Sequence, residues 1–145
     1  DERQYCAPGV ELPVASVMRS KYHDYPEYHT SLDDLEFVRP EHMQGSHDIY
    51  LGILQTLEAN RVYRTTVPCE PQLGPRGLYP NLGDRTHQEA ALYDRMALLA
   101  YADGKTDLIE IAEKNFTTVS CLELHVPALV ESGLLEEVSP SEATQ

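Results

Sequence analysis

The chain has 145 residues, which is enough for one ordinary domain or two small units. Eleven Lys and Arg residues against 24 Asp and Glu residues give a net charge of −13, which disfavours nucleic acids and other phosphate-rich partners. No apolar run approaches the ~18 residues that span a bilayer, and the three cysteines form no Cys-x-x-Cys pair, so we expect a cytoplasmic protein with reduced thiols and no membrane contact.

The first 60 residues predict a strand, a loop and a helix. Residues 10–18 are mostly apolar, which is typical of a strand buried in a mixed or parallel sheet. Residues 19–38 form a loop rich in Tyr, His and Asp. From Pro40, which suits a first helical turn, apolar residues recur at three- and four-residue spacing until Asn60. This pattern predicts an amphipathic helix that covers one face of the sheet.

Residues 61–84 change in character. A short strand is expected between Val62 and Val67, and seven Pro and Gly residues follow it. Such a segment is rich in turns but too particular in composition for a plain flexible linker. Two interpretations stay open: a packed connector between two domains, or a loop that lines a binding cleft.

Residues 85–138 predict three helices and a hairpin. The first helix ends at Tyr101, where Asp103-Gly104 closes it with a left-handed turn. The second runs over 108–115, and the third follows Thr117 or Thr118 with a kink at Pro127. Gly133 ends the third helix, a wing strand follows over 134–138, and the polar tail 140–145 is expected to be disordered. The order resembles a winged helix-turn-helix domain.

The charge of this second half argues against DNA. Residues 85–145 contain four Lys and Arg and eleven Asp and Glu, and so carry a net charge of −7. Affinity for DNA depends mainly on cations that neutralise phosphates. We therefore expect no nucleic-acid binding but protein contacts or a homo-oligomer, with Leu134, Leu135 and Val138 as a short apolar docking surface on the wing.

Three motifs in the same order point to a known family. They are Glu2-Arg3-Gln4-Tyr5-Cys6-x-Pro8-Gly9, Tyr25-Pro26-Glu27-Tyr28-His29-Thr30-Ser31, and Cys69-Glu70-Pro71-Gln72-Leu73-Gly74-x-Arg76-Gly77-Leu78-Tyr79. The chain resembles the end of the catalytic domain of dinuclear zinc aminopeptidases. It is more similar to a bacterial aminopeptidase-like subgroup linked to polysaccharide biosynthesis, whose members end in a small winged helix.

The resemblance implies an α/β fold and a division of the chain. Residues 1–84 would be the carboxy-terminal part of a zinc-aminopeptidase-like α/β sheet domain with its Pro/Gly-rich connector. Residues 85–139 would be a winged helix-turn-helix domain, followed by the tail.

The resemblance also implies roles for four residues. His29 would be a zinc ligand, Asp33 would shape the loop behind it, and Arg3 and Tyr5 would hold a peptide-like or amide substrate. A zinc-activated water would cleave that substrate in the longer parent protein. A lone imidazole builds no zinc site, which normally needs three protein ligands, so the chain itself is expected to be inactive and to hold no catalytic residue.

Two alternatives remain open. A local metal clip of His23, Asp24 and His29 is conceivable within the tyrosine-rich loop. The second alternative concerns the parent protein. It would be a non-catalytic binding or assembly module of a surface-polysaccharide pathway, which has kept the fold but lost catalytic activity.

Overall fold

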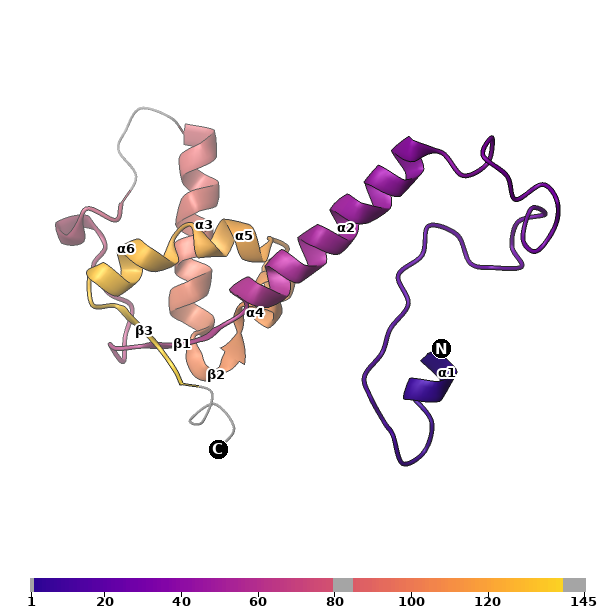
Figure 1. Ribbon diagram of the computed structural model, residues 1–145. Helices are drawn as coiled ribbons and strands as arrows, with labels where there is room; N and C mark the ends of the chain where they lie inside the picture. The colour runs from indigo at the N-terminus through magenta and orange to yellow at the C-terminus, as the bar shows by residue number, and fades with distance from the viewer. Residues whose placement is uncertain (1, 80–84, 140–145) are drawn as a thin grey trace. The chain divides into compact units, whose positions relative to one another are not determined.

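Two compact units make up the chain, residues 1–54 and 55–145. The computed structural model describes residues 2–79 and 85–139 (Figure 1). The first unit contains α1 (Glu2–Tyr5) and the greater part of α2 (Pro40–Ala59). The other elements belong to the second unit, in the order β1 (Val62–Thr65), the 3-10 helix η1 (Gly74–Arg76), α3 (Arg85–Tyr101), β2 (Asp103–Asp107), α4 (Leu108–Lys114), α5 (Val119–Glu123), α6 (Val126–Glu131) and β3 (Leu135–Glu137).

Buried side chains are distributed unequally between the two units. All the buried apolar side chains among the described residues lie between Tyr63 and Val138, and Leu98, Ile111 and Leu129 are completely covered. Residues 2–62 contain no buried side chain. The second unit therefore has a hydrophobic core, whereas the first unit is held by a few polar contacts.

Two predictions about the first unit can be compared with the structure, the strand at residues 10–18 and the helix from Pro40. The strand predicted for residues 10–18 is wrong, because this segment forms no strand and is exposed throughout. A strand needs a neighbour to pair its backbone groups, and no described residue supplies one. The helix predicted from Pro40 is confirmed as α2. It buries none of its side chains, however, so it does not cover a sheet as expected.

Polar contacts attach the segment before the loop to α2. The Tyr50 hydroxyl donates to the Val17 carbonyl oxygen at 2.8 Å. Arg19 Nη1 lies so close to α2 that a β-carbon at Gly45 would meet it at 3.0 Å. Glycine at this position lets the arginine lie against the helix backbone.

The second unit is built on a three-stranded antiparallel sheet in the order β2-β1-β3. β1 lies in the middle, with Tyr63 opposite Glu137 and Arg64 opposite both Glu136 and Asp103. β2 was not predicted, since Asp103-Gly104 was interpreted only as a turn. Gly104 has a φ of 86°, in the left-handed region that favours glycine, and the Arg64 side chain lies where a β-carbon would be.

The predicted domain boundary near residue 84 stays a prediction about the parent protein. In the structure, β1 lies upstream of that position and yet is the central strand of the second unit. Residues 80–84 of the predicted connector and the tail 140–145 lie outside the described residues.

Capping residues set the starts of α4 and α5, as predicted. Asp107 Oδ1 accepts from the Glu110 amide at 2.9 Å, and the Thr118 hydroxyl oxygen accepts from the Cys121 amide at 3.3 Å. Asn60 adds to the first cap, because its Oδ1 accepts from the Ile109 amide at 3.1 Å and its Nδ2 donates to Asp107 Oδ2 at 3.0 Å. Asn60, which directly follows α2, therefore also holds the start of α4 in place.

The third predicted helix is two helices. The chain breaks between α5 and α6 at Leu124–His125, and Pro127 lies in the first turn of α6. Proline lacks an amide proton and is tolerated in a first turn, so the chain starts a new helix where a kink was expected. Gly133, with a φ of 69°, follows α6 as predicted.

The proposed apolar docking surface on the wing is wrong. Leu134, Leu135 and Val138 have exposed fractions of only 1%, 2% and 5%. They fill the core of the second unit beside β3, and so they are not available to a partner. Among the helices of residues 2–79 and 85–139, none is both long and apolar enough to cross a membrane.

His125 gives the second unit a predictable pH dependence. Its Nε2 lies 4.0 Å from Asp94 Oδ2, and both side chains are mostly covered. Burial, with a smaller contribution from Arg95, lowers the pKa of His125 below 6.5, although Asp94 opposes the shift. The unfolded chain therefore takes up this proton at a higher pH than the folded chain. Stability should fall as the pH drops from 6.5 towards the folded pKa.

A variant tests whether His125 causes this fall in stability at low pH. His125→Gln should flatten the fall in stability across that window, measured by urea unfolding at a series of pH values. His42→Gln, an exposed change in the first unit, is the matched control and should keep the wild-type slope. A His125→Gln chain with an unchanged slope would contradict the assignment.

Candidate functional site

The loop before α2 gathers its aromatic rings around Tyr28. The imidazole of His29 stacks on the Tyr28 ring with centroids 4.1 Å apart and planes at 14°, and His23 meets the same ring edge-on at 4.7 Å. Tyr22 and Tyr25 lie at 5.9 and 6.0 Å from it. We call these five residues the Tyr28 cluster. The cluster brings the predicted ligand His29 and the nearby His23 onto one tyrosine.

A tight turn positions His29. Its φ of 57° lies in the left-handed region, which costs a residue with a side chain on the order of 1 kcal/mol or more. Thr30 supports the turn: its amide and its hydroxyl both donate to the Glu27 carbonyl oxygen, at 3.1 and 2.9 Å. The Thr30 hydroxyl oxygen also accepts from the Leu32 amide at 3.2 Å. Thr30 thus caps the turn that positions His29.

The acids after His29 have different surroundings. The Asp33 amide donates to the Thr30 carbonyl oxygen at 3.3 Å, but in the described chain its carboxylate makes no hydrogen bond to His29. Its proposed role behind the histidine stays a prediction. Asp34 was missed, although Asp before a turn is a known signal: its Oδ1 accepts from the Glu36 and Phe37 amides at 2.8 and 3.2 Å.

Arg3 and Tyr5 lie on α1, and both are exposed. The Tyr5 carbonyl oxygen accepts from the Leu12 amide at 2.9 Å, and this bond holds the turn after α1. Over the described residues, no contact joins either side chain to the Tyr28 cluster. Their roles in substrate binding therefore also stay predictions.

The described residues by themselves do not form a zinc site. Across residues 2–79 and 85–139, no three His, Cys, Asp or Glu side chains come together as a metal site. The conceivable clip of His23, Asp24 and His29 is therefore not assembled. His29 is exposed and offers a single imidazole, so any metal bound there would need ligands from outside this chain.

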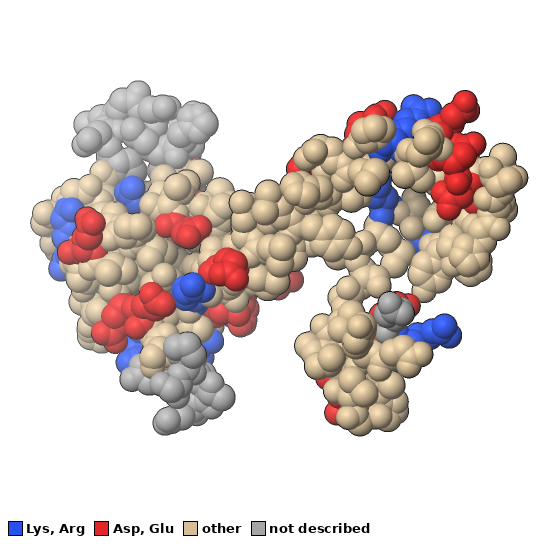
Figure 2. Space-filling model, viewed as in Figure 1, with Lys and Arg blue, Asp and Glu red and all other residues tan. Residues whose placement is uncertain are grey.

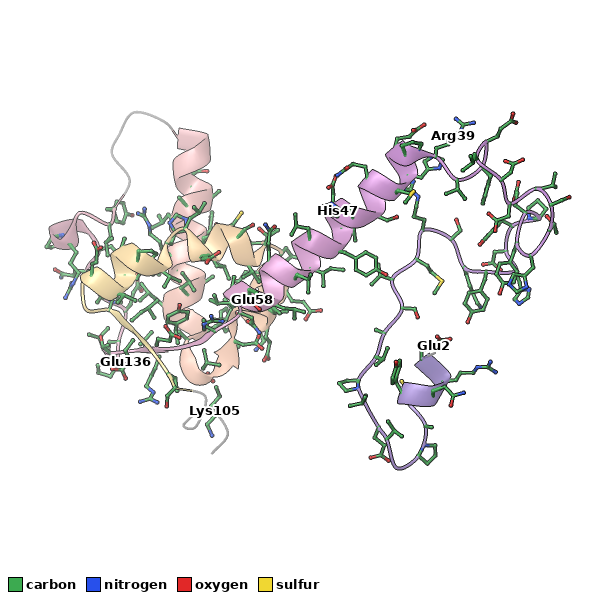
Figure 3. The ribbon with its side chains drawn as sticks, in the orientation of Figure 1. Glu2, Arg39, His47, Glu58, Lys105 and Glu136 are labelled. Atoms are coloured by element: carbon green, nitrogen blue, oxygen red, sulfur yellow. The ribbon has the colours of Figure 1, made fainter. Side chains whose placement is uncertain are left out.

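A hollow of about 600 Å³ lies beside the Tyr28 cluster and the start of α2. Its lining combines apolar and polar side chains and consists of Met18, Arg19, Ser20, Tyr25, Phe37, Val38, His42, Met43 and Ser46. Tyr25 belongs to both the cluster and the hollow, and its ring stacks on Phe37 at 5.6 Å. Figure 3 shows Arg39 at the beginning of α2, where its Nε donates to the Glu36 carbonyl oxygen at 2.7 Å.

Arg19 is the residue of this hollow that sequence reasoning missed. In the described part of the chain its guanidinium has no carboxylate within ion-pair distance, although the protein carries a net charge of −13. The available signal was weak, since one arginine in an acid-rich chain does not identify its neighbours. The hollow can accept an apolar group that also carries a negative charge.

Two positive charges of the second unit are paired with acids across its sheet. Arg61 Nε lies 3.5 Å from Glu137 Oε1, and Arg64 Nη1 lies 3.4 Å from Glu136 Oε1. Figure 2 shows acidic side chains over several parts of this unit's visible face. These pairs leave still less positive charge for phosphates than the sequence count suggested.

Two family models together match nearly the whole chain. Residues 1–60 match a family described as a domain of unknown function (DUF4910), and residues 61–137 match a family described as winged helix-turn-helix. The second match begins just before β1, in agreement with the place of β1 in the sheet.

Similar proteins are known from Clostridium acetobutylicum. The chain is 37% identical over 139 residues to a protein named "Putative polysaccharide biosynthesis protein with aminopeptidase-like domain". It is 34% identical, with a TM-score of 0.74, to a crystal structure of a "putative peptidase". In each case 95% of this chain is covered, but only 32% of the first relative and 30% of the second. The chain thus spans about a third of the length of its curated relative.

Proposed function

We propose, from the premise that this chain belongs to the winged helix-turn-helix family through residues 61–137, that it is a portion of a longer aminopeptidase-like hydrolase. The support is its similarity to two longer relatives with aminopeptidase-like or peptidase names. In the complete protein the reaction would be hydrolysis of a peptide-like or amide bond. The cytoplasm, as the location, remains a prediction.

The role proposed for His29 comes from the family resemblance, and the loop geometry leaves its imidazole accessible. His29 lies in a left-handed turn, its ring stacks on Tyr28, and its side chain is exposed. An exposed imidazole can bind a metal ion together with ligands from other parts of the complete protein. We assign His29 one position in a zinc site whose other ligands lie outside this chain. The chain alone would then be inactive, because the described residues contain no complete metal cluster.

The winged helix-turn-helix unit would serve protein contacts in the complete protein, as a docking element. Its arginines on β1 and beside it pair with Glu136 and Glu137 on β3. A duplex partner would require several cations free to meet phosphates. We therefore keep DNA out of the proposed function.

Replacing His29 in the complete protein tests the proposal. His29→Ala should lower kcat/KM for aminoacyl arylamides by at least ~100-fold, because even residues behind a metal ligand are worth 10–100-fold. Zinc content after dialysis should fall in the same variant. His47→Ala, an exposed histidine on α2, is the matched control and should leave both values unchanged.

Two outcomes would contradict it. Wild-type activity in His29→Ala would remove His29 from the site. If the intact, zinc-loaded protein hydrolyses no peptide or amide substrate, the non-catalytic module of a polysaccharide pathway becomes the better description. The 145-residue chain should show neither hydrolysis nor stoichiometric zinc, and one tightly bound zinc per chain would refute its predicted inactivity.

A further inference from the structure

A second concave surface lies within the second unit, between α3 and the proline-rich segment that follows β1. Two hollows of about 600 and 350 Å³ adjoin there and share Glu70, Pro71 and Met96. We call them together the Pro71 groove. Its floor is the partly buried apolar side of α3, with Leu92, Met96 and Leu99. The groove belongs to the unit that has its own core.

The backbone along one wall of the groove has unused hydrogen-bonding groups. Residues 66–73 belong to no helix or strand. In the described structure the amides of Cys69 and Glu70 donate to no protein acceptor. Pro68 and Pro71 cannot donate and restrict the chain, so this wall is stiff and does not pair with the sheet. Free amides on a restrained segment suit the carbonyl oxygens of another peptide chain.

Among the described residues, Glu70 is the only charged side chain that lines the groove. The nearby Arg76 does not pair with it, because Arg76 Nη1 donates to the Gln72 carbonyl oxygen at 2.7 Å. No cation lies within ion-pair distance of the Glu70 carboxylate among the described residues. An unpaired carboxylate beside an apolar floor favours a ligand with a positive charge next to an apolar group.

We propose that the Pro71 groove binds a peptide segment of a partner protein, with an apolar side chain over Met96 and a neighbouring Lys or Arg paired with Glu70. Methionine adapts to apolar side chains of different shapes, which suits such a floor. The carbonyl oxygens of the peptide would accept from the Cys69 and Glu70 amides. The groove is thus a different docking surface from the one expected at Leu134 and Leu135, which are buried.

Selection from a phage-displayed dodecapeptide library on the whole 145-residue chain tests the proposal. Enriched peptides should carry Lys or Arg beside an aliphatic or aromatic residue. A synthetic peptide of the enriched sequence should bind Ala100→Trp at least ~10-fold more weakly, because Ala100 lines the groove and tryptophan fills it. Ala90→Trp, an exposed alanine on the same helix that lines neither hollow, is the matched control.

Glu70→Gln tests the charge without filling the groove. It should weaken the same peptide several-fold and reduce the salt dependence of binding, whereas Glu113→Gln, an exposed acid on α4, should do neither. Absence of enrichment on the wild-type chain, or equal binding to Ala100→Trp and Ala90→Trp, would overturn the proposal. Binding to this chain but not to the complete protein would also overturn it, because the occupant would then be a segment of the parent itself.

Discussion

Replacing Leu98 by Ala should lower the free energy of unfolding of the second unit by about 2–5 kcal/mol, the usual cost of deleting a fully buried leucine side chain. Leu98 lies on α3 and has no exposed surface. Its loss leaves a cavity in the only core that the described residues form. Since small domains are stable by only about 5–15 kcal/mol, a large part of the population should unfold at moderate urea concentrations.

Urea unfolding followed by circular dichroism measures this effect. The matched control is Leu124→Ala at the end of α5, where the side chain is 77% exposed and the change should stay within about 0.5 kcal/mol. Equal losses for the two variants would mean that α3 does not carry the core. A loss confined to Leu98→Ala would support the packing described above.

Removing residues 1–54 should leave the unfolding midpoint of the remaining chain nearly unchanged and should abolish self-association. The buried side chains described here all lie between Tyr63 and Val138, so the shortened chain keeps its whole core. The removed part exposes many large apolar side chains, among them Leu35 at 88% and Met43 at 64%. Exposed apolar surface of this kind favours association between copies.

Analytical ultracentrifugation over a range of concentrations, together with thermal unfolding, checks both halves of this expectation. The full chain should gain apparent mass as concentration rises, and the chain from Gln55 should remain a monomer. Leu35→Ser in the full chain is the control for a local change and should not move the midpoint. A shortened chain that melts much earlier would show that the first unit supports the core after all.

Local signals were enough to predict most of the helices. The spacing from Pro40, the caps at Asp107 and Thr118, and Gly133 all depend on neighbours within a few residues. β2 could not be predicted in this way, because its sequence Asp-Gly-Lys-Thr-Asp has no alternating pattern. It is a strand only because β1, some forty residues earlier, pairs with it.

The same distinction explains the errors. The apolar residues 10–18 have strand composition, but pairing depends on a neighbouring strand, and none of the residues that the structure describes provides one. Leu134, Leu135 and Val138 are apolar at a predicted wing, and only the packing beside β3 shows that they are buried.

In the candidate site, too, local features could be predicted from the sequence and non-local contacts could not. The turn at Thr30 could be predicted, because it is local. The contact of His23 with Tyr28 and the position of Arg19 against Gly45 could not, since they depend on how the loop folds back. The family resemblance supplied the role of His29, which no spacing within this chain would have given.

The central position of β1 also has a consequence for synthesis. Arg64 on β1 and Glu136 on β3 are 72 residues apart in the chain, and the sheet cannot close until both have left the ribosome. At about 5–20 residues per second, β1 waits roughly 4–14 seconds for its second partner. During that time Tyr63 and the strand edge are open to chaperones and to neighbouring nascent chains.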